Sequence, residues 1–268
     1  MASYLRFRLN LLKRLKRIAR PFFGERSKIS LHTIKIIDFS LVQRKLLYFW
    51  CMTDLKLLEQ LETFLTHSRK EKFANVLAQR TKHFTVAVED VYQLHNTSAV
   101  IRSCDVFGLQ EVNIIEERNS KRIDREIAMG AQKWVDLNRF QTATDCIADL
   151  KQKGYQIVAT TPHANDCLLH DFDVSKKACF FFGSETEGLS EVVLNKADCF
   201  LKIPMVGFTE SLNISVSAAI IFQFVTTKLK QTTINWQLSE TEMLEKRLDW
   251  VKKTIKSYDD MVARFYAE

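Results

Sequence analysis

Apolar side chains follow two different spacings along this chain. Between residues 54 and 80 they recur every three or four positions, as on one face of an α-helix. Beyond residue 82, short continuous apolar runs, typical of buried strands, alternate with segments of helical spacing. This alternation predicts an α/β fold with a mostly parallel sheet, flanked by N- and C-terminal helices. The predicted strands cover 83–89, 112–115, 134–137, 155–160, 178–182 and 199–203, and the predicted helices cover 97–107, 142–152, 190–195, 212–230 and 240–266.

Glycine and proline mark several of these boundaries. Gly108 and Gly154 follow predicted helices, where a glycine readily takes the left-handed conformation that ends a helix. Pro204 ends the last predicted strand. The 268 residues include only 7 Gly and 3 Pro, which excludes long flexible linkers. Because no apolar run approaches the roughly 18 residues of a membrane-spanning helix, no membrane partner is expected for the body of the chain.

Positive charge is concentrated at the N-terminus. Residues 1–51 carry 12 of the 39 Lys and Arg but only 2 of the 32 Asp and Glu, so the net charge of +7 combines a leader of +10 with a body of −3. A basic amphipathic helix, an organelle transit peptide and translated upstream sequence are all compatible with such a leader. The change of composition at Met52 favours the third. We expect a leader (1–51), a helical segment (52–80), an α/β domain (81–230) and a helical tail (231–268).

The signatures of common cofactor and metal sites are missing. The six cysteines form no C-x-x-C pair and have no zinc-site spacing with histidine, so we expect buried thiols in a reducing cytoplasm and no metal. No G-x-G-x-x-G motif is present to bind a dinucleotide. The segment 183–188 has the two glycines of a phosphate loop, but it lacks the lysine and contains two carboxylates that would repel a triphosphate.

Three other segments follow a predicted strand or open a predicted helix, where ligands bind in open α/β sheets. Asn96 precedes the helix 97–107 and could cap it, with Arg102 in the second turn. The turn 183–188 follows a buried strand, and Ser211 precedes the helix 212–230. Taken separately, each segment has an ordinary structural explanation as a cap or a tight connection.

Taken together, the segments form an ordered set of motifs. The set reads N-x-x-A-x-x-R, then F-x-G-x-E-x-x-G-L, then I-P-M followed by S-L-N-x-S-x-x-A-A. It resembles the SpoU/TrmH family of RNA 2′-O-ribose methyltransferases, of the SPOUT class, over roughly residues 80–230. The resemblance implies a C-terminal trefoil knot within 81–230, S-adenosylmethionine held in the knot, and a homodimer whose active site joins both subunits.

The resemblance also implies roles for single residues. In such a reaction the protein must orient a ribose 2′-hydroxyl and stabilise the developing alkoxide. Because a guanidinium is a poor base, we expect Arg102 to act as a fixed cation beside the neighbouring phosphate. The implied catalytic residues are Asn96, Arg102, Glu185, Ser211 and Asn213, and the implied cofactor contacts, largely through the main chain, are Thr160, Gly183, Ile203 and Leu212.

Substrate RNA is expected to meet local basic clusters. Only a helical pair precedes the α/β domain and a helical tail follows it, a pattern similar to the members of the family that methylate guanosine 18 of tRNA. A ribosomal-RNA 2′-O-methyltransferase of the same family and a non-catalytic RNA-binding or assembly factor are the alternatives. The residues expected to contact RNA are Lys72, Arg80, Arg122, Arg125, Lys252 and Lys253.

Overall fold

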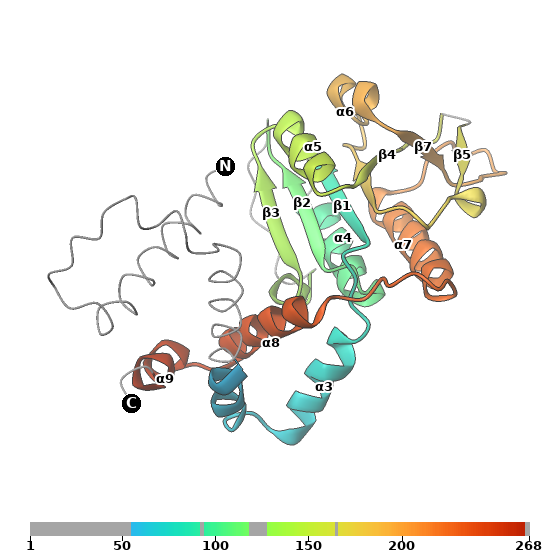
Figure 1. Cartoon of the computed structure of the whole chain (residues 1–268). Helices are drawn as coiled ribbons and strands as arrows, with labels where there is room; N and C mark the ends of the chain where they lie inside the picture. Colours follow the sequence, from blue (N-terminus) through green and yellow to red (C-terminus); the bar gives the residue numbers. More distant parts are fainter. Residues whose placement is uncertain (1–54, 92–93, 118–127, 164–165, 266–268) are drawn as a thin grey trace, which may run out of the picture. The chain divides into compact units, whose positions relative to one another are not determined.

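The computed structural model describes residues 55–91, 94–117, 128–163 and 166–265 (Figure 1). The chain divides into two units after Met52, of which the second is Thr53–Glu268. Every described residue belongs to the second unit, and the description below concerns that unit alone. In this part of the chain, no helix has both the length and the apolar character needed to cross a membrane.

The second unit is built on a seven-stranded sheet in which all the paired strands are parallel. The strand order is β3-β2-β1-β6-β4-β7-β5, which places β1 and β6 at the centre, where every residue of both strands is buried. The prediction of a mostly parallel α/β sheet is therefore confirmed. The strands are β1 (Phe84–Glu89), β2 (Glu111–Ile115), β3 (Asp136–Phe140), β4 (Gln156–Thr160), β5 (Cys167–Leu168), β6 (Ala178–Phe182) and β7 (Cys199–Lys202).

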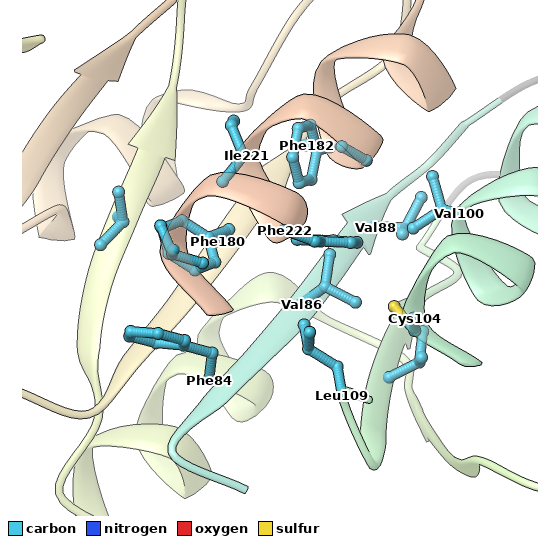
Figure 2. Close-up of a cluster of buried hydrophobic side chains, with 14 of the residues drawn as sticks. Phe84, Val86, Val88, Val100, Cys104, Leu109, Phe180, Phe182, Ile221 and Phe222 are labelled. Carbon is cyan, nitrogen blue, oxygen red and sulfur yellow. The ribbon is translucent and has the colours of Figure 1, made fainter. Parts of the chain in front are cut away.

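Helices cover both faces of the sheet (Figure 1). On one face, α4 (Leu94–Phe107) packs against α7 (Ile214–Lys230), and alternate residues of β1 and β6 face this pair. Figure 2 shows Phe222 of α7 among these strand residues, with ring centroids 6.4 Å from Phe180 and 6.1 Å from Phe182. The opposite face is covered by α5 (Ala143–Gln152) and α6 (Glu191–Lys196). The short helices η2 (Ala131–Lys133) and η3 (Leu169–Asp171) complete the α/β domain.

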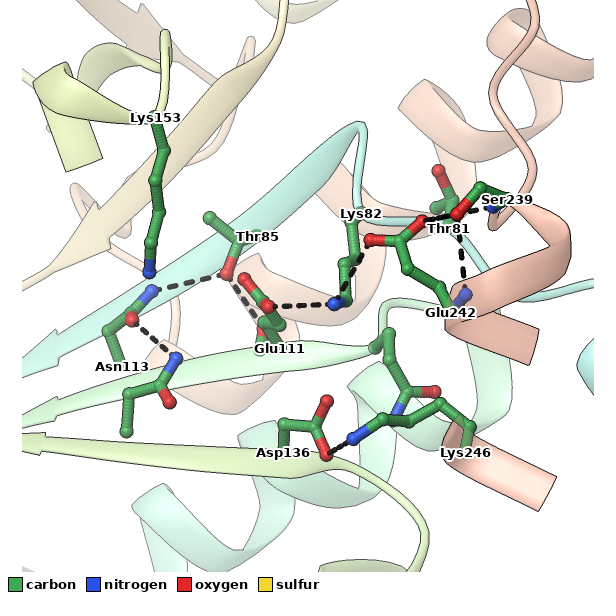
Figure 3. Close-up of polar contacts among 12 residues, drawn as sticks. Thr81, Lys82, Thr85, Glu111, Asn113, Asp136, Lys153, Ser239, Glu242 and Lys246 are labelled. Carbon is green, nitrogen blue, oxygen red and sulfur yellow. Dashed lines mark hydrogen bonds and ion pairs between the residues drawn. The ribbon is translucent and has the colours of Figure 1, made fainter. Parts of the chain in front are cut away.

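The N- and C-terminal helices form a separate hydrophobic cluster. Residues 55–62 and α3 (His67–Leu77) pack with α8 (Glu240–Thr254) and α9 (Tyr258–Phe265). Trp250 lies at its centre and contacts the rings of Phe73 and Trp134 at 5.5 and 5.6 Å between centroids. Ion pairs join α8 to the α/β domain: Lys82 lies between Glu111 of β2 and Glu242 of α8, and Lys246 of α8 pairs with Asp136 of β3 (Figure 3).

Several predicted boundaries differ from the structure. The strand expected at 134–137 begins at Asp136 and runs to Phe140, because Trp134 turns into the helical cluster. The helix expected at 97–107 begins at Leu94, so Asn96 lies inside α4 and does not cap it. The cap of α7 is Asn213 rather than Ser211. The predicted 240–266 tail is two helices, since Ile255 has an extended backbone.

Candidate active site

A cavity of about 690 Å³ opens at the carboxyl ends of β4, β6 and β7. Parallel strands present their carboxyl ends at one edge of the sheet, which is where α/β proteins bind ligands. Three loops line it: the one after Thr160, the one after Phe182 and the one between Ile203 and Ile214. The four residues expected to contact the cofactor all line this cavity, namely Thr160, Gly183, Ile203 and Leu212.

The loop after β6 is closed by its own backbone. Ser184 and Gly188 exchange two hydrogen bonds, each of 3.0 Å between nitrogen and oxygen. A Cβ at position 183 would overlap the carbonyl group of Gly188, and Gly188 itself has a φ of +71°. Both conditions require glycine. The two glycines that resemble a phosphate loop therefore serve to fold the loop tightly against the cavity.

Three of the predicted catalytic residues meet beside the cavity. The side-chain amides of Asn96 and Asn213 both donate to Oε1 of Glu185, at 2.9 and 2.8 Å. Asn213 also donates to Oδ1 of Asn96 at 3.2 Å. Asn96 is buried in α4, Asn213 caps α7 and Glu185 projects from the loop after β6, so three separate elements hold this triad. Each hydrogen bond to the carboxylate is of the stronger, charge-assisted kind.

The other two predicted catalytic residues stand apart from the triad. Ser211 lines the cavity, but no hydrogen bond joins it to the triad. Arg102 is an exposed residue of α4 with no hydrogen-bond or ion-pair partner in the described part of the chain. Six residues after Asn96, it is displaced by about 9 Å along the helix axis and about 120° around it. It consequently faces away from the triad of its own chain.

The structure changes the expectation for one predicted RNA contact. Arg80 is only 1% exposed, pairs with Asp105, donates to the carbonyl of Leu109 and stacks over Trp250. It therefore joins the α/β domain to α8, and the prediction that it contacts RNA is wrong. Lys72 and Lys252 are exposed, as RNA contacts must be. Among the remaining RNA candidates, Lys253 donates to the carbonyl of Lys133 and pairs with Asp249, whereas Arg122 and Arg125 lie outside the described residues.

Sequence reasoning missed a second carboxylate behind the site. Glu89, the last residue of β1, is only 4% exposed and accepts hydrogen bonds from Ser190. Its one sequence signal is an acidic residue at the end of a largely apolar strand. Within the described ranges, no three His, Cys, Asp or Glu side chains gather in a way that could hold a metal ion.

These features define an α/β protein with a ligand cavity among three loops and a polar triad at its edge. A model of the SpoU rRNA methylase family matches residues 83–223. A tRNA (guanosine(18)-2′-O)-methyltransferase of Borreliella burgdorferi is 37% identical to this chain, and the match covers 76% of this chain and 94% of that protein. The chain belongs to the SpoU methylase family.

Solved structures share the fold. The crystal structure of the A. aeolicus TrmH/SpoU tRNA modifying enzyme is 29% identical, with a TM-score of 0.63 over 70% of this chain and 97% of that chain. The SpoU methyltransferase AviRb from Streptomyces viridochromogenes, crystallised in complex with AdoMet, is 22% identical, with a TM-score of 0.51 over 59% of this chain and 62% of that chain. The fold of this chain is therefore that of SpoU methyltransferases.

Proposed function

We propose that this protein is an S-adenosylmethionine-dependent tRNA 2′-O-ribose methyltransferase that modifies guanosine 18. The observation that carries the proposal is the triad of Asn96, Glu185 and Asn213 at the edge of a cavity lined by three loops. The names of relatives such as the Borreliella burgdorferi protein support the choice of substrate. A cytoplasmic location is part of the proposal.

The cavity has the size and the lining that S-adenosylmethionine requires. Cofactor pockets typically measure about 300–1,000 Å³, and this cavity measures about 690 Å³. Leu201, Ile203 and Leu212 supply apolar surface for an adenine ring, while the backbone at Gly183 can be approached closely. When bound, the cofactor supplies an electrophilic methyl group. We further propose that the three lining loops form the trefoil knot implied by the sequence motifs.

The triad can orient the ribose without acting as the base. Two amide donors hold the Glu185 carboxylate in one position, so its second oxygen can face the ribose. Arg102 carries a permanent charge and holds the phosphate next to the target ribose, which favours loss of the hydroxyl proton. The proton then passes to that phosphate, while Arg102 keeps its charge.

A homodimer would bring Arg102 to a triad. Val106 lies one helical turn beyond Arg102 on the same side of α4 and is 66% exposed. On α7, which packs against α4, Val216 and Ile220 are likewise four residues apart and exposed. An apolar surface of this kind is typical of a subunit interface. We propose that it packs against a second copy, so that Arg102 of one chain completes the triad of the other.

Transfer of a labelled methyl group from S-adenosylmethionine to purified RNA tests the proposal. The tRNA transcript should be methylated, and a transcript that differs only in having adenosine at position 18 should not. The family name includes ribosomal RNA, so a ribosomal-RNA transcript belongs in the same assay. Methylation of ribosomal RNA alone would favour the first alternative. RNA binding without transfer would favour a non-catalytic factor.

A further inference from the structure

Glu89 is a buried carboxylate outside the three sequence motifs described above. Its side chain lies at the end of the central strand β1 and is almost completely enclosed. One oxygen accepts from the backbone N–H of Ser190 at 2.9 Å, and the other accepts from the Ser190 hydroxyl at 2.6 Å. A buried charge is costly unless hydrogen bonds or charges compensate it. Two donors from a single residue therefore indicate that this contact has a specific purpose.

The contact closes the loop that lines the cavity. This loop leaves the sheet after Phe182, which pairs in register with Val88 of β1. It returns at Ser190, which Glu89 holds and which also caps α6 through its hydroxyl oxygen. Strand β1 thus fixes both ends of the loop, one by backbone pairing and the other by the Glu89 side chain. The seven residues between these ends, 183–189, all line the cavity.

Glu185 lies within this clamped loop. Its carboxylate can meet Asn96 and Asn213 only if the loop ends are held at the correct separation from α4 and α7. A displacement of about 1 Å at a reacting group can reduce a rate by about 10²-fold. A shift of the loop at Ser190 would therefore move the Glu185 carboxylate relative to Asn96 and Asn213.

We propose that Glu89 is a positioning residue, which acts through Ser190 to hold the 183–189 loop in the shape that binds S-adenosylmethionine and presents Glu185. This inference rests on the proposed function. It extends that function by assigning a role to a residue that touches neither the cavity nor the triad.

The test compares Glu89→Ala, Glu89→Gln and Ser190→Ala with the wild-type chain. Cofactor affinity is measured by calorimetry, and kcat and KM are measured for tRNA and for the cofactor. Asp198→Ala serves as the control. The Asp198 carboxylate also accepts a hydrogen bond from a backbone N–H, that of Ile157 at 2.8 Å, but Ile157 lies near the start of β4, at the end of that strand away from the cavity. Melting temperatures of all variants show how much each substitution costs in stability.

Glu89→Ala is expected to weaken cofactor binding about 10-fold, because a buried donor loses its partner, and to lower kcat by about 10-fold or more. RNA affinity should stay within about twofold, since the basic candidates lie elsewhere. Glu89→Gln keeps an oxygen for the Ser190 N–H and should recover most of the loss. Asp198→Ala should lower the melting temperature and leave cofactor affinity unchanged.

Coupling between the two residues provides an independent check. If Glu89 acts through Ser190, combining Glu89→Ala with Ser190→Ala should cause no further loss of cofactor affinity beyond that of the more damaging single substitution. If Glu89→Ala does not fold, Ser190→Ala decides the matter by weakening cofactor binding while Glu89 remains in place. A folded Glu89→Ala protein with wild-type cofactor affinity and kcat overturns this inference alone. A wild-type chain that binds no S-adenosylmethionine overturns the proposed function as well.

Discussion

Complementation between two inactive variants distinguishes an active site shared by two chains from one contained in a single chain. Arg102 faces away from the triad of its own chain, so we expect it to act on the triad of a second chain. Asn96→Ala removes one donor to Glu185, and Arg102→Ala removes the cation. Loss of a single transition-state contact typically costs about 10²–10³ in rate, so each variant alone should be nearly inactive.

A mixed dimer of these two variants contains one intact site. One chain provides a complete triad and the other provides Arg102, while both defects fall in the second site. Co-expression with two different affinity tags isolates only mixed dimers, whose kcat per dimer should be about half of the wild-type value. This is a gain of about 50-fold or more over either variant alone.

The reciprocal pairing gives the opposite result. A chain with both substitutions, paired with a wild-type chain, should be inactive, because each site then lacks either Asn96 or Arg102. An active site within one chain predicts the reverse of both outcomes: no activity from the mixed singles and half activity from the double with wild type. Those two results together would refute a site shared between subunits. Arg102 is exposed, so Arg102→Ala should change the melting temperature little.

Three further predictions concern the loop, the core and the ion pairs of the tail. Gly183→Ala should abolish cofactor binding in calorimetry, because a Cβ there overlaps Gly188, whereas Gly207→Ala, whose Cβ would lie 3.9 Å from its nearest neighbour, should bind normally. Trp250→Ala should destabilise the protein by about 3–5 kcal/mol in urea unfolding, since the side chain is 2% exposed. Burial opposes ionisation of Glu242, but hydrogen bonds from its helix cap and the charge of a nearby lysine outweigh burial and lower its pKa below 4.5. A group whose pKa is depressed by folding stabilises the fold above its unfolded pKa, so Glu242→Gln should lower the melting temperature at pH 7 and have progressively less effect as the pH falls below about 4.5.

The central sheet could be predicted from the sequence because its strands are buried on both faces. Strand β6 is a continuous apolar run and β1 is largely apolar, a composition typical of strands buried on both faces of a parallel sheet. The edge strand β3 was placed too early, since its sequence Asp-Leu-Asn-Arg-Phe is half polar and only partly buried. Strand β5, with two residues, is too short to produce any pattern.

The motifs located the site, but not its internal contacts. The three segments that carry Asn96, Glu185 and Asn213 each had an ordinary structural explanation in the sequence, and only the fold joins these side chains by hydrogen bonds of 3.2 Å or less. Arg80 was misinterpreted as an RNA contact because the residues that enclose it come from distant segments, above all Trp250. Glu89 was missed because an acidic residue at the end of a strand usually lies in solvent.

The position of the methyl group in cellular tRNA tests the proposed function most directly. Total tRNA from a strain that lacks this gene, and from the same strain with the gene restored, is digested to defined fragments and analysed by mass spectrometry. We predict that 2′-O-methylguanosine at position 18 is lost in the deletion strain, returns with the wild-type gene and does not return with Arg102→Ala. An unchanged methyl group at position 18 in the deletion strain, or its loss from ribosomal RNA instead, would contradict the assignment.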